Sequence, residues 1–214
     1  PIFDRDKILV TIHPDNPDVW FWLIPFRDGR ASVGVVAREE FFGSIPGDHE
    51  TKLKYLLGVD VELSRILIDC EFDTPVNTLV GYSSNVSQMC GPGFALLGNA
   101  GEFIDPIFSS GVTIALRSAS MAAAAVDKIL RGTEIDWDAE FTRPLGAGVA
   151  TFKDYVECWY ENSLHSVFFA ASQQPRIKQM ICSILAGYAW DTSNPYTKRA
   201  RRRIEVLANL SEPR

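Results

Sequence analysis

Residues 98–112 read GNAGEFIDPIFSSGV, and this stretch decides how the middle of the chain folds. The apolar run Phe94–Leu97 before it predicts a buried strand that ends at Gly98. The Ala-rich stretch Val112–Leu130 after it has high helix propensity, and Gly132 is a typical helix end. The sequence therefore predicts a strand that stops, a loop, and a long helix that starts at the loop.

The string WFWLIP at residues 20–25 is the second informative stretch. In an extended strand successive side chains alternate faces, so Trp20 and Trp22 share one side and lie roughly 6 to 7 Å apart along it. Phe21 and Leu23 make the opposite side apolar as well, which predicts a strand covered on both faces. On composition alone, the string is a core strand that is rich in tryptophan.

Taken together, the two strings resemble the flavin-dependent halogenases. Residues 98–112 are similar to the second flavin-contact motif of FAD-dependent monooxygenase-like proteins, usually written Gly-Asp-Ala, then Asp-Pro, then Ser-Ser-Gly. The order and spacing of the motifs match roughly the C-terminal half of such an enzyme. The resemblance implies an α+β (mixed α/β) fold: part of a substrate-domain β-sheet, the flavin-contact strand, loop and helix, and a C-terminal helical region.

Three segments are expected along the chain. Residues 1–74 form the substrate-domain sheet with its following helices, 75–132 the second flavin-contact motif and long helix, and 133–214 the C-terminal helical region. The strands are predicted over 7–12, 19–25, 31–37 and 77–82, and the first two helices over 48–57 and 61–68.

Glycines and prolines predict the turns between these elements. Asp28-Gly29 has the positive-φ chemistry of a tight hairpin turn. The helices after the sheet are expected to be punctuated by Gly47 and Gly58, and the C-terminal helices to be broken near three prolines. These are Pro144, Pro175 and Pro195.

A Gly-x-Gly-x-x-Gly turn after a strand, the fingerprint that holds the ADP half of FAD in two-domain flavoproteins, does not occur in this sequence. The nearest glycine cluster, Gly91 and Gly93, precedes a strand instead of following one. We therefore expect a fragment whose N-terminal Rossmann half is missing. Its FAD site is expected to be incomplete.

The loop residues predicted to contact FAD are Gly98, Asn99, Ala100, Pro106 and Ser109. The two small residues, Gly98 and Ala100, let a ribityl chain or pyrophosphate approach the backbone closely. In the family the position of Asn99 is usually Asp, which contacts the ribityl hydroxyls, so Asn99 keeps the shape and loses the charge. The alternative for Asn99 is a turn residue that satisfies its own backbone.

The resemblance assigns halide binding, of chloride or bromide, to the backbone N–H groups of Ser110 and Gly111. These residues open the long helix, and a helix N-terminus carries unsatisfied N–H groups and roughly half a unit of positive charge. Such a site stabilises an anion. The alternative is that Ser109 or Ser110 caps a purely structural helix.

Phe108 bears on the substrate. Free-tryptophan halogenases usually carry a glutamate here, whereas phenol and pyrrole halogenases resemble this chain in carrying Phe. That implies a small phenolic or pyrrolic substrate, which is either free or tethered to a carrier protein. The family resemblance also allows a flavin reductase that acts in trans. Plain core packing of Phe108 is equally consistent with the sequence.

The family makes hypohalous acid from reduced FAD, oxygen and a halide, and the acid travels past the tryptophan wall to a lysine and then to an aromatic carbon. By resemblance, Trp20 and Trp22 form that wall between flavin and substrate. The lysine belongs to the family's N-terminal half. Asp105 is expected to order the loop, not to carry a proton.

Composition sets the remaining expectations. The 214 residues are 46% hydrophobic and 22% charged, which is ordinary for a globular protein, and the net charge of −6 argues against a nucleic-acid surface. Four cysteines without Cys-x-x-Cys spacing are expected to be reduced thiols in a cytoplasmic protein. The three histidines have no ligand spacing for a metal, and no apolar run is long enough to span a membrane.

Two other functions stay open. One is a non-halogenating FAD-dependent monooxygenase or reductase of the same superfamily; the other is a non-enzymatic remnant whose helices bind a partner. We also expect self-association, because either the sheet face with Phe21 and Leu23 or the helix face with Ile114 and Leu116 would lack its original cover.

Overall fold

The computed structural model describes residues 3–170 and 174–211. Its contacts divide the chain into two compact units, residues 1–80 and residues 81–214. The first is built on a small sheet with helices and the second is mostly helical, so the mixed α/β fold is confirmed.

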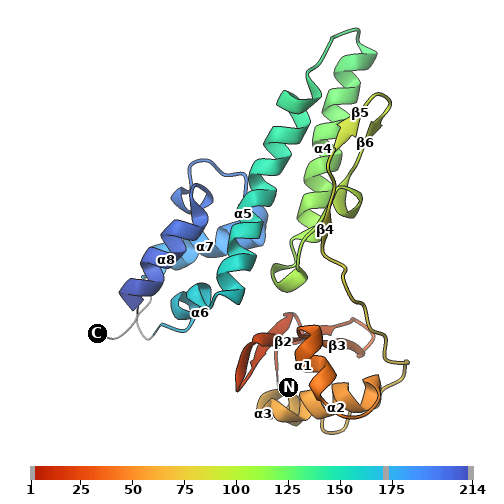
Figure 1. Ribbon diagram of the computed structural model, residues 1–214, viewed down its shortest axis with the longest axis vertical. Helices are drawn as coiled ribbons and strands as arrows, with labels where there is room; N and C mark the ends of the chain where they lie inside the picture. The colour runs from red at the N-terminus through yellow and green to blue at the C-terminus, as the bar shows by residue number, and fades with distance from the viewer. Residues whose placement is uncertain (1–2, 171–173, 212–214) are drawn as a thin grey trace. The chain divides into compact units, whose positions relative to one another are not determined.

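The first unit contains a three-stranded antiparallel sheet in the order β1-β2-β3 (Figure 1). Its strands are Leu9–His13, Asn16–Pro25 and Ala31–Val36. The predicted hairpin between β2 and β3 is confirmed, because Gly29 has a φ of +96° and the Phe26 N–H donates to the Arg30 carbonyl at 2.8 Å.

Three helices follow the sheet: α1 (Glu39–Ser44), α2 (His49–Val59) and α3 (Val61–Ile66). The short helix α1 was not predicted. Gly58 lies inside α2, so its predicted role as punctuation is wrong. The boundary is Asp60 instead, whose carboxylate accepts from the N–H groups of Glu62 and Leu63 and so caps α3.

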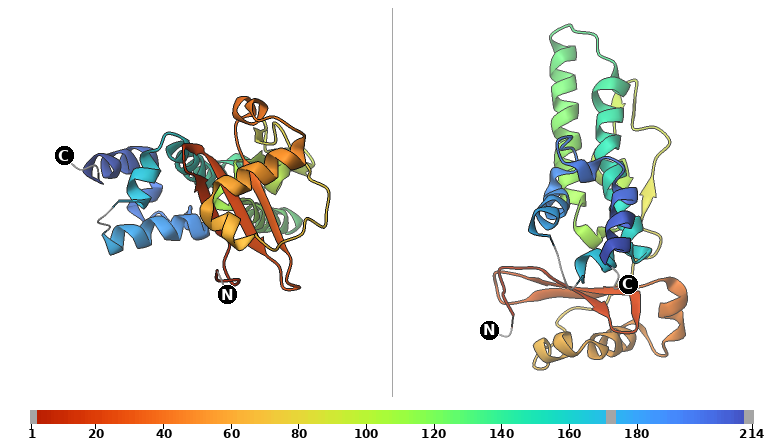
Figure 2. Two further views of the ribbon diagram at one scale, coloured as in Figure 1. Left: turned by 90° about the horizontal axis from the view of Figure 1, so that it is seen from below. Right: turned by 90° about the vertical axis from the view of Figure 1, so that its left-hand side faces the viewer.

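The core of the first unit lies between the sheet and the helices, which cover one face of the sheet (Figure 2). Phe21 and Leu23 point into this core and are fully buried, together with leucines of α2 and α3. The expectation that their face would lack a cover is therefore wrong. Burying two large apolar side chains in this way stabilises a fold by about 1.5–3 kcal/mol each.

The second unit begins with short paired segments instead of full strands. These are β4 (Ser84–Asn85) with β7 (Glu102–Phe103), and β5 (Cys90–Gly91) with β6 (Phe94–Ala95). Residues 77–82 form no strand, because the structure gives them no paired neighbour among the described residues.

The predicted buried strand at Phe94–Leu97 is also wrong. Only Phe94 and Ala95 are paired, and Phe94 and Leu97 are exposed. A two-residue ladder offers no second sheet neighbour to bury the run, so apolar sequence alone does not make it a core strand.

The predicted loop and long helix are confirmed. A 3₁₀ turn covers Gly98–Ala100, a second one covers Pro106–Phe108, and α4 runs over Gly111–Leu130. Gly132, with a φ of +81°, follows the helix end. On α4, Ile114 is buried, so the expected lack of cover there is wrong, whereas Leu116 is exposed as expected.

The C-terminal part is helical, as predicted. It contains a π turn at Asp138–Thr142, the helices α5 (Arg143–Tyr160), α6 (Ser163–Phe168), α7 (Pro175–Ser183) and α8 (Ala200–Ser211), a second π turn at Ile184–Tyr188 and a 3₁₀ turn at Pro195–Thr197. Helices α4 and α5 run side by side (Figures 1 and 2).

Two of the three predicted proline breaks are confirmed, since Pro175 begins α7 and Pro195 begins a 3₁₀ turn. The break at Pro144 is wrong. The backbone stays helical from residue 137 through α5, and the wider π turn that precedes Pro144 accommodates the ring and the missing N–H.

Candidate functional site

The predicted tryptophan pair forms on β2 in the first unit. The rings of Trp20 and Trp22 lie with their centroids 6.1 Å apart and their planes tilted by 56°. Phe21 packs on the opposite side of the strand, against the helices, as the alternation of a strand requires. The predicted side-by-side arrangement and spacing are confirmed.

Trp22 is fixed by its neighbours on β3. Gly34 lies directly opposite Trp22 in the ladder, and a Cβ atom placed on Gly34 would be 2.2 Å from the indole ring. The indole therefore lies flat across the backbone of β3, a position that only glycine leaves open. The indole Nε1–H donates to Ser32 Oγ at 3.1 Å, which orients the ring. Neither supporting residue was predicted from the sequence.

The other predicted site residues lie in the second unit, on the loop that leads into α4. Gly98 has a φ of +51°, and a Cβ there would be 2.9 Å from the Cβ of Ala115. The Gly98 N–H donates to Ser118 Oγ at 2.9 Å. Gly98 thus lets the loop pack closely on α4. This is a structural reason for glycine here, in addition to the predicted close approach of the cofactor.

The loop brings most of the predicted residues to the surface. Gly98 and Ser110 are buried. The exposed ones are Asn99, Ala100, Pro106, Ser109 and Gly111. Residues 12 positions apart meet here, since the side-chain oxygen of Asn99 lies 3.8 Å from a Cβ placed on Gly111. The amide of Asn99 therefore lies beside the start of α4.

The N-terminus of α4 has no side-chain cap. Ser110 occupies the capping position without a side-chain hydrogen bond, and Ser109 has a left-handed backbone with a φ of +53°. The first backbone bond of the helix runs from Ile114 N–H to the Ser110 carbonyl. Among the described residues, the N–H groups of Gly111, Val112 and Thr113 have no acceptor. Unpaired N–H groups at a helix N-terminus are the kind of group that can bind an anion.

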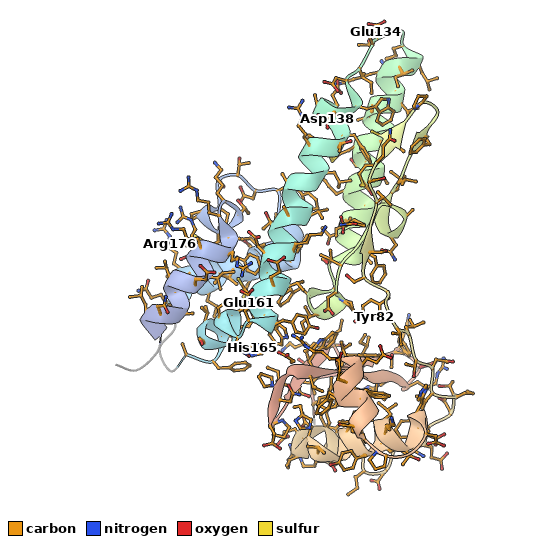
Figure 3. All side chains as sticks on the ribbon, viewed as in Figure 1. Tyr82, Glu134, Asp138, Glu161, His165 and Arg176 are labelled. Carbon is orange, nitrogen blue, oxygen red and sulfur yellow. The ribbon has the colours of Figure 1, made fainter. Side chains whose placement is uncertain are left out.

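Asp105 holds the loop in place, as predicted. One carboxylate oxygen accepts from the Ile107 N–H at 3.0 Å, and the other accepts from the hydroxyls of Tyr160 at 2.9 Å and Tyr82 at 3.3 Å (Tyr82 is labelled in Figure 3). Burial raises the pKa of Asp105 above its ordinary value. Burial, together with the neighbouring Asp105, raises the pKa of Tyr82 to about 12, so this hydroxyl keeps its proton.

Phe108 contacts a second aromatic residue. Its ring meets that of Trp159 edge to face, with 5.8 Å between centroids and 89° between planes. Trp159 is buried, and its ring also meets His165 at 4.1 Å. Phe108 therefore ties the loop to α5. The packing interpretation of Phe108 is supported, and it does not exclude a second role at the loop surface.

The part of the chain that the structure describes also bears on metal groups, disulfides and membrane spans. Residues 3–170 and 174–211 contain no group of His, Cys, Asp and Glu side chains arranged for a metal ion. All four cysteines are free thiols. Across the same residues, none of the helices has the length and hydropathy of a membrane span.

Comparison with curated proteins finds flavin-dependent halogenases. The chain is 28% identical over 224 residues to the 1H-pyrrole-2-carbonyl-[peptidyl-carrier protein] chlorinase of Pseudomonas fluorescens, covering 98% of this chain and 47% of that protein. It is 33% identical over 160 residues to a flavin-dependent halogenase of Penicillium aethiopicum, covering 71% and 30%. No family model matches.

Solved structures match the fold of this chain. A flavoprotein/dehydrogenase of Cytophaga hutchinsonii superposes with a TM-score of 0.91 at 38% identity, over 96% of this chain and 50% of that one. A flavin-dependent brominase shares the fold, with a TM-score of 0.74 at 22% identity over 96% of this chain. The match to the pyrrole chlorinase and these two matches cover nearly the whole of this chain but only about half of each matched protein.

Proposed function

Because the curated relatives of this chain are flavin-dependent halogenases, we propose that it is part of an FAD-dependent halogenase-like oxidoreductase acting on an aromatic substrate. The observation that carries the proposal is the exposed loop at the uncapped start of α4. One relative is named for chlorinating a pyrrole held on a carrier protein. A phenolic or pyrrolic substrate, free or carrier-tethered, is the class that we assign to this protein.

The loop fits the flavin edge that the proposal requires. Ala100, Pro106 and Ser109 leave an open, low-bulk surface, and Asn99 offers an amide that donates and accepts hydrogen bonds. FAD, when bound and reduced, would supply two of the four electrons that reduce oxygen, and the halide would supply the other two as it becomes hypohalous acid. The residues of this chain would hold the flavin and exclude water from its edge. The contacts to the adenine and pyrophosphate would come from elsewhere in the complete enzyme.

The halide is assigned to the backbone N–H groups of Ser110 and Gly111. The N–H groups that open α4 lack acceptors among the described residues, and the helix end supplies partial positive charge. Asn99, beside Gly111, adds polarity without the negative charge that an aspartate would place next to an anion. A charge-neutral neighbour favours anion binding because two like charges about 4–6 Å apart repel each other.

Trp20 and Trp22 are assigned to the wall that separates the substrate from the flavin. Trp22 is held across Gly34 by packing and by its bond to Ser32, so its ring is pre-positioned instead of mobile. A fixed wall would let hypohalous acid pass while keeping the aromatic substrate from direct contact with the oxidised flavin. The non-halogenating alternative needs no such wall, and product analysis with and without halide separates the two.

The test is Trp22→Ala in the complete enzyme. If the wall interpretation holds, flavin oxidation continues while halogenated product per flavin oxidised falls several-fold, because the oxidant leaks or the substrate is misplaced. Ser32→Ala is the matched control: it removes only the hydrogen bond to the indole, worth about 0.5–1.5 kcal/mol, and keeps both rings.

A purely structural Trp22 gives a different result. Replacing a fully buried Trp with Ala costs about 3–5 kcal/mol, and the half-buried Trp22 would lose part of that, so folding, flavin content and activity would fall together. Unchanged product per flavin oxidised in the folded fraction of Trp22→Ala would remove the wall from the mechanism.

A further inference from the structure

Residues 174–211 carry an excess of positive charge that the rest of the chain does not share. This segment holds seven basic and two acidic residues, whereas the rest of the sequence holds 14 basic and 25 acidic ones. Five of the seven basic residues lie in one short run, at Lys198, Arg199, Arg201, Arg202 and Arg203. The proposed function assigns no role to this run.

One arginine of the run is paired with acidic residues on the protein surface. Arg201 pairs with Glu157 and Glu161 of α5 and with Glu205 of its own helix (Glu161 is labelled in Figure 3). These pairs join α8 to α5, while Ala200, Ile204 and Ala208 bury the inner side of α8. The positive charge of Arg201 is therefore matched by acidic partners and serves packing.

The arginines that follow it are not neutralised. Arg202, Arg203, Val206 and Leu210 are all exposed and fall within an arc of about 100° on the helix, since each residue turns it by about 100°. We call these four residues the α8 outer face. Among the described residues neither Arg202 nor Arg203 has an ion pair, and Arg203 only donates to the Lys198 carbonyl. Val206 and Leu210 are 52% and 73% exposed.

The position of these arginines in the helix is electrostatically unfavourable. They lie in the first turn of α8, which contains no acidic residue. A helix N-terminus already carries partial positive charge, so cations placed there cost a few tenths of a kcal/mol, whereas an anion placed there is stabilised. An anionic partner at this end of α8 would relieve the repulsion. Beyond it, Val206 and Leu210 extend the same face with apolar area.

We propose that the α8 outer face docks the acidic amphipathic helix of a small carrier protein that delivers the tethered substrate, an inference that rests on the proposed function. Carboxylates of the partner helix would meet Arg202 and Arg203, and its apolar side chains would meet Val206 and Leu210. Charge complementarity of this kind speeds association and fixes orientation more than it adds affinity.

An anionic membrane is a weaker match for the same face. The apolar side of α8 that a surface-bound helix would insert into lipid is already buried against the protein. A membrane also extends well beyond the patch, and the remaining chain, with its excess of acidic residues, would be repelled by it. A small acidic protein can contact the α8 outer face without approaching the acidic remainder of the chain.

The experiment measures binding of the full-length protein to the peptidyl-carrier protein of the pyrrole chlorinase relative, loaded with pyrrole-2-carbonyl and labelled for fluorescence anisotropy. We expect Arg202→Glu with Arg203→Glu to raise the Kd at least about ten-fold, and added salt to weaken the parent complex. Arg27→Glu with Arg65→Glu is the matched control, because it makes the same change of net charge on exposed residues of the other unit.

Three results would overturn the docking proposal: equal Kd values for parent and double variant, no binding of the carrier at about 100 μM (weaker than ordinary transient complexes), or arginine-dependent binding to phosphatidylserine vesicles without binding to the carrier. The proposed function fails separately. Carrier binding without any halogenated product would reject halogenation and keep the docking face, whereas halogenation of a free phenol without carrier binding would do the reverse.

Discussion

At the scale of single residues, Asp105 shows how a short motif is held in shape. Its carboxylate joins the backbone of the second 3₁₀ turn to hydroxyls that come from 23 residues upstream and 55 residues downstream. The Asp-Pro pair is visible in the sequence, and its loop-ordering role was predicted. Tyr82 and Tyr160 were not, because no local pattern reveals a hydrogen bond across such separations.

Asp105 also gives a pH dependence with a definite sign. Burial raises its pKa in the folded chain above the ordinary 3.8, so the folded chain keeps a proton that the unfolded chain has released. The stability that this group contributes is complete below the unfolded pKa and is lost as pH rises through the folded pKa. We expect Asp105→Asn to gain stability relative to the parent as the pH rises from about 4 toward neutrality.

Urea unfolding of both proteins across that range measures the difference. Asp191→Asn is the control with the opposite sign, since hydrogen bonds from Ser193 lower the pKa of the exposed Asp191, and its contribution is lost as pH falls. A parent-minus-variant difference that stays constant with pH would show that Asp105 titrates alike in both states.

The tryptophan pair could be predicted because strand alternation alone fixes which side chains share a face. The residues that hold Trp22 in place could not be predicted. Gly34 and Ser32, which lock Trp22 in place, lie on another strand, and only the register of the β2–β3 hairpin brings them opposite each other.

At the scale of elements, the sequence predicted correctly those elements whose structure is determined by residues within them. The hairpin at Asp28-Gly29 and the helix α4 both follow from residues within them. The strand predicted at Phe94–Leu97 failed because a strand needs a neighbour that its own sequence does not contain. The continuity of α5 through Pro144 depends on the preceding π turn, which has no reliable sequence signal.

Helix α5 offers a matched test of packing. Trp190 lies against Gly148, where a Cβ would be 2.1 Å from the indole, and the indole Nε1–H donates to the Pro144 carbonyl at 2.9 Å. Gly146, two residues earlier on the same helix, is exposed and has nothing within 4 Å of such a Cβ. We expect Gly148→Ala to destabilise by about 1–3 kcal/mol and Gly146→Ala to stabilise by about 0.5–1 kcal/mol.

Chemical unfolding of the two variants beside the parent measures both changes. Equal shifts in the same direction would mean that helix propensity dominates and that Trp190 moves aside without cost. A large loss in Gly148→Ala accompanied by a red-shifted tryptophan fluorescence would place the strain at the Trp190 contact.

At the scale of the whole molecule, we expect the 214-residue chain to bind FAD weakly. The loop before α4 is proposed to contact only part of a dinucleotide, and the glycine fingerprint that cradles the pyrophosphate does not occur in the sequence. Titration followed by flavin fluorescence gives the Kd. A value below about 1 μM would show that the site is more local than the proposal holds.

Self-association is expected from the outer side of α4. Six exposed apolar residues share one stripe at helical spacing: Val112, Leu116, Ala119, Ala123, Val126 and Leu130. Contiguous apolar surface of this kind is rare on monomers. We expect Leu116→Lys to shift sedimentation toward monomer, and Ala124→Lys, which adds the same charge off the stripe, to leave it unchanged. A parent that sediments as a monomer at high concentration and binds no apolar dye contradicts this expectation.

Residues 71–83, which contain the boundary between the two units, form neither helix nor strand, and Leu79 and Val80 in this segment are highly exposed. The buried cluster of the first unit is formed by residues between Val19 and Leu63, and Val76 of this segment packs against it. The proposed substrate wall on β2 and the proposed flavin loop before α4 lie in separate compact units, so selection could change one without the other. Such modularity would let one flavin chemistry acquire new aromatic substrates by replacing a single small domain.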